Sequence, residues 1–517
     1  MGWNREETWS VTAVAGAALL LLVPLGMVVF PALPDYPAHL ASYDLIATGA
    51  RAPAVAGYYG IEWAFIPNLA GEIVVPALSH VVGLYTAARL FLGAALAMWA
   101  LGPALVHRAL FGRYGVAPVF AAFFACNANL SWGFLNFYFA MGCGLLVIAA
   151  WIATAERRSA PILLGFSLLV TAVYFSHLFA AATLLLILGC FEAGEFYRRP
   201  GRKDLVRRFG SLAVVFAPAL SAYLFLKPRG AESGIAFDLA DRALDKLGAA
   251  IEFRFDDPSY VLLGLLAVLL ATGLWQGWIA MHRRMALPLA ALALAALLAP
   301  EWALGGWGVD LRLPGVVGAL VFASVEFRLE RRKQLVLATA ALCVLAAETM
   351  AQARDWRSYD ARASELRAAL RQLPPGKRIL TVLDGNAIGY GADQPYWHMA
   401  ELAIIDPGAF TPLMFTTRDQ HVIRLRPQVA RIAANSAEQG SPPDIDELND
   451  LAAGRIDDDE DIAQVFPYLM KFQCHFDEAV VIHLGGVRSA VPSVLRLRRS
   501  GSFFAIYDIV PDSRCGA

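Results

Sequence analysis

The chain has 517 residues, of which 58% are hydrophobic and only 17% are charged, and its mean hydropathy is +0.52. Soluble globular proteins carry about 25% charged residues, so this composition argues against a soluble protein. The net charge of −1 leaves no basic excess for binding nucleic acid, and no nucleic-acid partner is expected.

Long apolar runs recur through the first two thirds of the chain, for example VTAVAGAALLLLVPLGMVVF and VLLGLLAVLLATGLWQGWIA. A run of about 20 residues, at 1.5 Å per residue in a helix, matches the roughly 30 Å hydrocarbon core of a bilayer. The runs lack the alternating polarity of barrel strands, so helices must satisfy the backbone within lipid. The sequence therefore predicts a polytopic α-helical membrane protein.

Basic clusters separate these runs at regular intervals. The clusters are Arg5, Arg108 with Arg113, Arg157–Arg158, Arg198 through Arg208, Arg283–Arg284 and Arg328 through Lys333. Each interval between clusters is long enough for two crossings around a polar break, and the breaks lie at 32–72, 127–136, 175–177, 227–260 and 301–314. Five helical hairpins and a last helix at 334–353 give about eleven transmembrane helices. Because basic loops stay in the cytoplasm, the N-terminus is expected there and the C-terminus on the other side.

The composition changes near residue 354. We expect a transmembrane domain at 1–353, with outer loops 32–72 and 227–260, and a soluble periplasmic α/β domain at 354–517. In this second domain an amphipathic helix covers 355–372, and the β-rich runs RILTVL, EAVVIHLG and VLRLRRSGSFFAIYDIV follow it. A Pro- and Asp-rich exposed loop is predicted at 436–462. Cys474 and Cys515 could form a disulfide if this domain is oxidised.

The strongest candidate for chemistry follows the first apolar run, in the segment Leu33-Pro34-Asp35-Tyr36-Pro37-Ala38-His39-Leu40. Asp35 lies at the expected membrane boundary, where partial desolvation suits a carboxylate for general-base work. His39 shares its face if the stretch 38–48 is helical. The alternative is that Asp35 caps this helix and His39 lies among lipid headgroups.

An acidic residue after the first helix, an interfacial helix, many spans and an extracytoplasmic C-terminal domain resemble the GT-C superfamily of glycosyltransferases. The chain is also similar to bacterial membrane proteins that share a DYPxHLA segment, a Pro-Asn-Leu-Ala segment (here Pro67–Ala70) and an Arg-Leu-Pro segment (here Arg312–Pro314). The resemblance implies a polyprenyl-phosphate sugar as donor and Asp35 as the residue that activates the acceptor. The sequence departs from the family in the second outer loop, which carries asparagines in place of a second acidic residue.

Further candidates for substrate binding lie in the other polar breaks. They are Glu62 and Asn68 in the first outer loop, His177 within an apolar block, Arg229 after the seventh span, and Asp310 with Arg312 before the tenth. Arg312 and Arg229 are candidate ligands of a donor phosphate, since arginine binds phosphate with two parallel hydrogen bonds. An interhelical hydrogen bond is the competing explanation for the position of His177. For Glu62 the competing explanation is a solvated carboxylate with no binding role.

No metal-binding motif such as HExxH or CxxC occurs. The pair Asp256–Asp257 could hold a divalent metal ion, although adjacent aspartates in a loop are more often a solvated turn. No other cofactor is expected.

Taken together, these features predict an inverting GT-C-type glycosyltransferase of the bacterial inner membrane. It would transfer a sugar from a polyprenyl-phosphate donor to an envelope glycan, lipid or protein acceptor on the periplasmic side. A non-catalytic membrane partner or a transporter in envelope polysaccharide assembly is the alternative, and a GT-C fold that has lost turnover is a third possibility. A transporter would be expected to show inverted repeats, and none is visible in the sequence.

Overall fold

The structure is a computed structural model of the chain. It describes residues 5–226, 234–238, 242–385, 393–433, 441–455, 468–485, 488–511 and 515. The chain forms two compact units. The first comprises Met1–Met27, Phe65–Ala70 and Arg89–Asp355, and the second comprises Val28–Ala64, Gly71–Ala88 and Trp356–Ala517.

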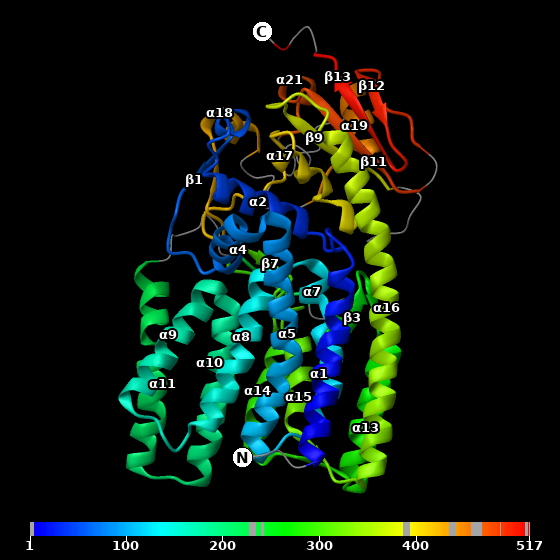
Figure 1. Ribbon diagram of the computed structural model, residues 1–517. Helices are drawn as coiled ribbons and strands as arrows, with labels where there is room; N and C mark the ends of the chain where they lie inside the picture. The colour runs from blue at the N-terminus through cyan, green and yellow to red at the C-terminus, as the bar shows by residue number, and fades with distance from the viewer. Residues whose placement is uncertain are drawn as a thin grey trace. The chain divides into compact units, whose positions relative to one another are not determined.

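Long apolar helices make up most of the first unit, and Figure 1 shows them running side by side. Ala and Leu dominate these helices, and both residues have high helix propensity. The helices are α1 (Arg5–Gly26), α5 (Leu84–Phe111, of which Arg89 onward belongs here), α8 (Leu135–Ala153), α9 (Ala160–Ser176), α10 (Leu178–Arg198), α11 (Arg202–Phe225), α13 (Tyr260–Gln276), α14 (Ala286–Leu298), α15 (Pro314–Ala323) and α16 (Arg331–Leu370, as far as Asp355). Helices α8 to α11 pack against one another, and α14 packs against α10 and α15.

Six helices within the described ranges are long and apolar enough to cross a membrane. They are α1 from Glu7, α5, α8, α10, α11 and α16. Shorter apolar helices of 10–17 residues include α4 (Ala70–Val82), α9, α13 and α15. The structure thus has the apolar helices of a membrane protein, as predicted, whereas the number of about eleven spans stays a prediction.

The polar breaks between these helices contain short elements. Helices α6 (Pro118–Ala121) and α7 (Ala128–Trp132) precede α8, and α12 (Ala243–Gly248) follows α11. Three small sheets complete the unit: β3 (Glu252–Arg254) with β4 (Asp257–Pro258), β5 (Ile279–Met281) with β8 (Val325–Phe327), and β6 (Trp302–Ala303) between β2 (Ile235–Ala236) and β7 (Gly306–Trp307).

The prediction of two separate helices at 334–353 and 355–372 is wrong. Helix α16 runs without interruption over Arg331–Leu370, a length of 40 residues. No Pro or Gly lies within it, so no residue forces a break where the composition turns from apolar to polar. The helix ends shortly before Pro374, as predicted.

A four-stranded sheet forms the centre of the second unit, in the order β12-β13-β11-β9. Its strands are β9 (Ile379–Asp384), β11 (Glu478–His483), β12 (Leu495–Ser500) and β13 (Phe504–Ile509), in agreement with the three predicted β-rich runs. β9 and β11 are parallel and buried throughout, whereas β12 exposes an arginine-rich edge. Charged side chains on an edge strand discourage pairing with other chains. Within the predicted loop 436–462, residues Ile445–Ala453 instead form helix α19, and much of the rest lies outside the described ranges.

Residues from the first outer loop complete the second unit. Helix α2 (Tyr36–Thr48) packs against the short helices η4 (Met399–Glu401) and α17 (Leu402–Ile405). Strand β1 (Tyr59–Ile61) pairs antiparallel with β10 (Ile423–Leu425). Gly71 allows α4 to approach α2, because a Cβ at this position would clash with the hydroxyl of Tyr43.

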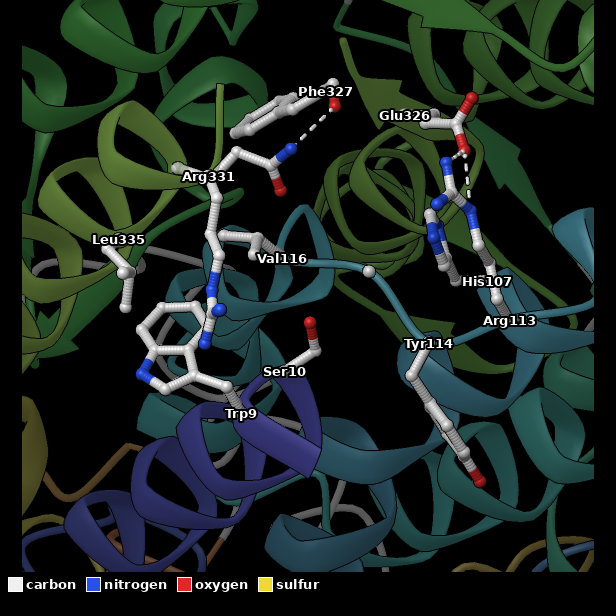
Figure 2. A pocket seen from close by; sticks show the side chains of 12 residues that line it. Trp9, Ser10, His107, Arg113, Tyr114, Val116, Glu326, Phe327, Arg331 and Leu335 are labelled. Atoms are coloured by element: carbon white, nitrogen blue, oxygen red, sulfur yellow. Dashed lines mark hydrogen bonds and ion pairs between the residues drawn. The ribbon is translucent and has the colours of Figure 1, made fainter. Parts of the chain in front are cut away.

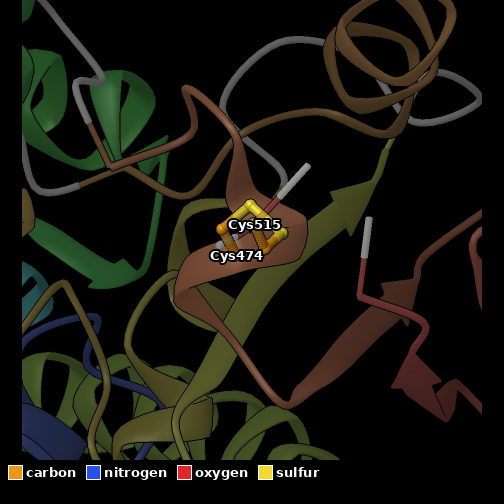
Figure 3. The surroundings of a disulfide bond; sticks show 2 residues. All are labelled: Cys474 and Cys515. Atoms are coloured by element: carbon orange, nitrogen blue, oxygen red, sulfur yellow. A yellow bond between two sulfur atoms is a disulfide. The ribbon is translucent and has the colours of Figure 1, made fainter. Parts of the chain in front are cut away.

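A disulfide joins Cys474, in helix α21 (Phe472–His475), to Cys515 near the C-terminus (Figure 3). The pairing considered from the sequence is therefore confirmed. The bond closes a segment with a sequence separation of 41 residues. Restricting such a loop in the unfolded chain stabilises the fold, and longer loops give larger effects.

Replacing both Cys474 and Cys515 with Ser is expected to lower the free energy of unfolding of the second unit by roughly 2–4 kcal/mol, because the unfolded chain regains loop entropy. Thermal unfolding of the purified protein in detergent would measure this, and a reductant should reproduce it in the wild type. Cys343→Ser is the matched control, since Cys343 is exposed and unpaired. An unchanged melting temperature in the double variant would contradict a stabilising role.

Candidate functional site

Asp35 directly precedes α2 in the second unit. It takes the N-cap position, but its side chain makes no capping hydrogen bond and its backbone is helical, with φ −78° and ψ −13°. A capping residue normally has an extended backbone and accepts a hydrogen bond from the first turn. The side chain is 19% exposed. Helix capping therefore does not account for the carboxylate of Asp35.

His398 approaches Asp35 from the segment before η4. Its Nε2 lies 4.0 Å from Oδ1 of Asp35, and its Nδ1 lies 3.5 Å from Oε2 of Glu401. Both His398 and Glu401 are fully buried. The three side chains form a row that begins at a buried carboxylate, passes through an imidazole and ends at the partly exposed Asp35.

The charge state of His398 follows from these neighbours. Burial lowers the pKa of His398, but the hydrogen-bonding and charge of Glu401, together with the charge of Asp35, raise it, and the net pKa lies above the ordinary 6.5. Glu401 therefore favours the imidazolium form of His398.

Phe415 is the common neighbour of three imidazoles. Its ring centroid lies 5.3 Å from that of His39, 5.0 Å from that of His398 and 5.2 Å from that of His421. Burial, and to a lesser degree Arg424, lowers the pKa of His421 to about 3, so this imidazole is neutral. The cluster thus combines one imidazole whose cationic form is favoured with a neutral one around a single aromatic ring.

His39, predicted to orient Asp35, lies one turn into α2. Its backbone N–H donates to the carbonyl of Asp35 at 3.0 Å, and its ring stacks on that of Tyr43. The structure adds a second histidine, His398, at the carboxylate of Asp35 itself. Glu62 lies in the same unit, where it forms ion pairs with Arg424 at 3.3 Å and Arg418 at 3.8 Å.

In the first unit, Arg312 and His177 are brought together. Nη1 of Arg312 lies 3.3 Å from Nε2 of His177, and Nη2 donates to the carbonyl of Trp307 at 3.2 Å. The guanidinium lies 4.6–5.6 Å from three ring centroids, those of Phe134, Phe137 and Phe179. Cation–π contacts of this kind hold a buried arginine in an otherwise apolar setting.

His177 owes its position to the break between α9 and α10. Its extended backbone ends the first helix, and its Nδ1 accepts a hydrogen bond from the N–H of Phe179 as the cap of the second. The cap leaves Nε2 directed toward Arg312. Nε2 thus contacts a guanidinium in the loop before α15, and the interhelical hydrogen bond weighed from the sequence stays a prediction.

The remaining candidate substrate-binding residues of the first unit that the structure describes form contacts with other side chains. Asn68 accepts hydrogen bonds from Asn136 at its carbonyl and side-chain oxygens. Asp310 is fully buried and pairs with Arg242, whose Nε lies 2.7 Å from its Oδ2. Arg229 lies outside the described residues.

Glu252 is a buried carboxyl group that the sequence analysis did not select. It accepts a hydrogen bond from the hydroxyl of Ser131, in the second outer loop, at 2.6 Å, and another from the N–H of Asp256. Burial raises the pKa of Glu252 to about 7. Through the hydrogen bond with Ser131, a carboxyl group from the predicted fourth outer loop (227–260) contacts the predicted second outer loop (127–136).

No group of three or more His, Cys, Asp or Glu side chains suited to a metal ion occurs among the described residues. Asp257, one of the two adjacent aspartates, pairs with Arg254 at 2.5 Å, and the N–H of Asp256 donates to Glu252. These contacts favour the solvated-turn explanation of this pair over the metal site.

Sequence reasoning also did not assign His398 and Glu401 to Asp35. The cluster Tyr396-Trp397-His398 stands out in the sequence as aromatic and polar, but nothing in its spacing points to a residue in the first outer loop. A histidine followed three residues later by a glutamate was the only local signal.

Comparison with known proteins adds no relative: no family model, curated protein or solved structure matches the chain. The resemblance to the GT-C superfamily therefore depends on the layout and short motifs of the sequence.

We expect the stability of the second unit to decrease as pH rises above neutrality. His398 has a folded pKa above its unfolded value of about 6.5, so its contribution is fully present below that pH and is lost as pH rises through the folded pKa. Glu401→Gln removes the main charge that holds the proton, and His398→Gln removes the titrating group. Melting temperatures across pH 5–9 should show this dependence in wild type and in His80→Gln, an exposed-histidine control, but not in the two site variants.

From the raised pKa of Glu252 we expect a second pH dependence of stability, over a different pH range. Its folded pKa of about 7 exceeds the ordinary 4.5, so the free energy of unfolding falls as pH rises from 4.5 to 7. Glu252→Gln keeps the hydrogen-bond acceptor and removes the charge. At pH 8, relative to pH 5, the variant should gain up to ~3 kcal/mol over wild type. Asp245→Asn, an exposed carboxylate in the same loop, is the control, and equal pH profiles for wild type and Glu252→Gln would refute the assignment.

Proposed function

We propose that the protein is a membrane glycosyltransferase that moves a sugar from a polyprenyl-phosphate donor to a hydroxyl acceptor. The observation that carries the proposal is the carboxylate of Asp35, which no helix cap uses and which the buried pair His398–Glu401 supports. A partly exposed carboxylate with an ordered partner is what a general base requires.

In the proposed reaction Asp35 accepts the proton of the acceptor hydroxyl. The acceptor oxygen attacks the anomeric carbon of the sugar, a new C–O bond forms, and the bond to the donor phosphate breaks with inversion. The electron pair leaves with the polyprenyl phosphate. His398, whose Nε2 lies 4.0 Å from Oδ1 of Asp35, would orient this carboxylate.

The departing phosphate needs cations placed in advance, since charge accumulates on it in an oxocarbenium-like transition state. Arg312 is our candidate in the first unit, with His177 at its Nη1 and a ring of aromatic side chains around it. Burial in apolar surroundings strengthens the attraction between a guanidinium and a phosphate. Glu252 would provide a second carboxyl group near the asparagine-rich second loop.

The cysteine pair supports a location outside the cytoplasm for the second unit. Disulfides persist in oxidising compartments such as the bacterial periplasm and are rare in the cytosol. Positive-inside placement of the basic clusters leads to the same orientation. We therefore propose a bacterial inner-membrane protein with a periplasmic C-terminal unit.

Asp35→Asn is expected to lower sugar transfer at least 10³-fold, because the amide cannot accept the proton, while the protein still inserts and folds. His398→Gln should lower transfer by about 10–100-fold by leaving Asp35 poorly oriented. The assay would incubate the purified protein in nanodiscs with a panel of radiolabelled polyprenyl-phosphate sugars and an envelope extract, and measure label in the acceptor.

Asp44→Asn is the matched control, since Asp44 is an aspartate within α2 itself, and its pKa is raised to about 6 by burial and by Asp406. Transfer by this variant should equal that of wild type. Wild-type turnover in Asp35→Asn would refute the base assignment. Binding of a polyprenyl phosphate without transfer from any donor would favour the non-catalytic alternative.

A further inference from the structure

A small cavity lies in the first unit, apart from the residues discussed so far (Figure 2). It has a volume of about 50 Å³. Its walls come from the start of α1, the end of α5 and the turn after it, strand β8 and the first turn of α16. Four segments distant in sequence therefore enclose it.

The charge on the walls is positive. Arg113 pairs with Glu326, with 2.7 Å between Nη2 and Oε1, so these two charges offset each other. Arg331 contributes a second guanidinium and forms no ion pair or hydrogen bond within the described part of the chain. Figure 2 shows its side chain extending toward the indole of Trp9. Arg331 also opens α16, so the positive end of a long helix dipole adds to its charge.

A buried polar side chain faces the same cavity. His107 is 1% exposed and lines the cavity; the backbone of Ala323 is a polar neighbour of its ring, but neither ring nitrogen makes a hydrogen bond of normal geometry. Leaving a buried polar group unsatisfied costs about 1–3 kcal/mol. A bound acceptor with several oxygens would satisfy this imidazole and the guanidinium of Arg331 together.

The cavity adjoins the basic ends of three candidate spans. Helices α1, α5 and α16 all begin or end beside it, and Arg108, Arg332 and Lys333 lie in the same segments. Clusters of this kind mark the cytoplasmic end of membrane helices. Basic pockets between helices on that side bind phosphate-bearing lipid headgroups.

We propose that this cavity binds a phosphate group, carried by an anionic phospholipid of the cytoplasmic leaflet or by a phosphorylated small molecule. Arg331 donates to the phosphate oxygens with support from His107, and the apolar side chains of Trp9 and Leu335 contact the attached chain or ring. Neither Asp35 nor Arg312 lines this cavity, and the proposal does not depend on the proposed transferase activity.

The test compares melting temperatures of the detergent-purified protein in the presence of phosphatidylglycerol, phosphatidylcholine or inorganic phosphate. An occupied site stabilises the folded state in proportion to saturation, so phosphatidylglycerol should raise the melting temperature at concentrations where phosphatidylcholine does not. Arg331→Gln should weaken the apparent affinity at least tenfold. Arg332→Gln, an exposed neighbour that does not line the cavity, should leave the affinity unchanged.

The comparison between phospholipids and inorganic phosphate distinguishes a lipid ligand from a soluble phosphorylated compound. Stabilisation by inorganic phosphate that equals that by phosphatidylglycerol, and is lost in Arg331→Gln, would support the phosphate site and assign it to a soluble compound. Equal effects of Arg331→Gln and Arg332→Gln would indicate attraction to surface charge alone and would overturn the proposal. So would equal stabilisation by both phospholipids.

Discussion

The cost of removing charge from water determines how the buried charged side chains of this structure are arranged. An ion moved into a low-dielectric interior loses several kcal/mol of solvation, and only close partners compensate for it. In the first unit, the fully buried Glu192 bonds to Arg158 at 2.6 Å, to Arg208 at 2.8 Å and to the indole of Trp151. These four side chains connect α8, α10 and α11 with the turn between α8 and α9. Buried charge therefore specifies which helices can be neighbours.

The same constraint operates in the second unit. Asp384 and His483 end the parallel strands β9 and β11 in register, and their side chains meet at 2.6 Å. Ser489 donates to the same carboxylate from its hydroxyl and its backbone N–H, and these bonds outweigh burial to lower the pKa of Asp384. This cluster fixes strand register and holds the segment after β11. The carboxylate of Asp384 is occupied by these structural contacts, whereas the buried Nε2 of His483 makes no hydrogen bond within the described part of the chain.

The cluster of Asp35, His398 and Glu401 differs from these two structural clusters. Glu401 and His398 are buried, as structural pairs are, but the row of side chains ends at a carboxylate that is partly exposed. A purely structural pair would have no reason to extend to the surface. The cavity at Arg331 differs in a similar way, because a guanidinium and a buried imidazole line a space that no protein group fills. At the Arg331 cavity, the buried ring nitrogens of His107 without a hydrogen bond of normal geometry distinguish a candidate binding site from a purely structural contact.

The sequence by itself determined the features that depend on local composition. Apolar runs required helices in lipid, Pro374 ended α16, and alternating β-branched runs gave β9, β11 and the hairpin of β12 with β13. It also directed attention to Asp35, His177 and Arg312. Its division of α16 into two helices was wrong, because a change in polarity does not end a helix that contains no breaker.

Only the tertiary structure decided which polar groups meet. His398 with Asp35, Glu252 with Ser131, and Asp310 with Arg242 are pairs whose members do not select each other by spacing or residue type. Packing of α2 against η4 and of the outer loops within the first unit brings them together. The reason is physical: local propensity acts over one or two turns of chain, whereas the pairing of buried charges depends on which surfaces pack.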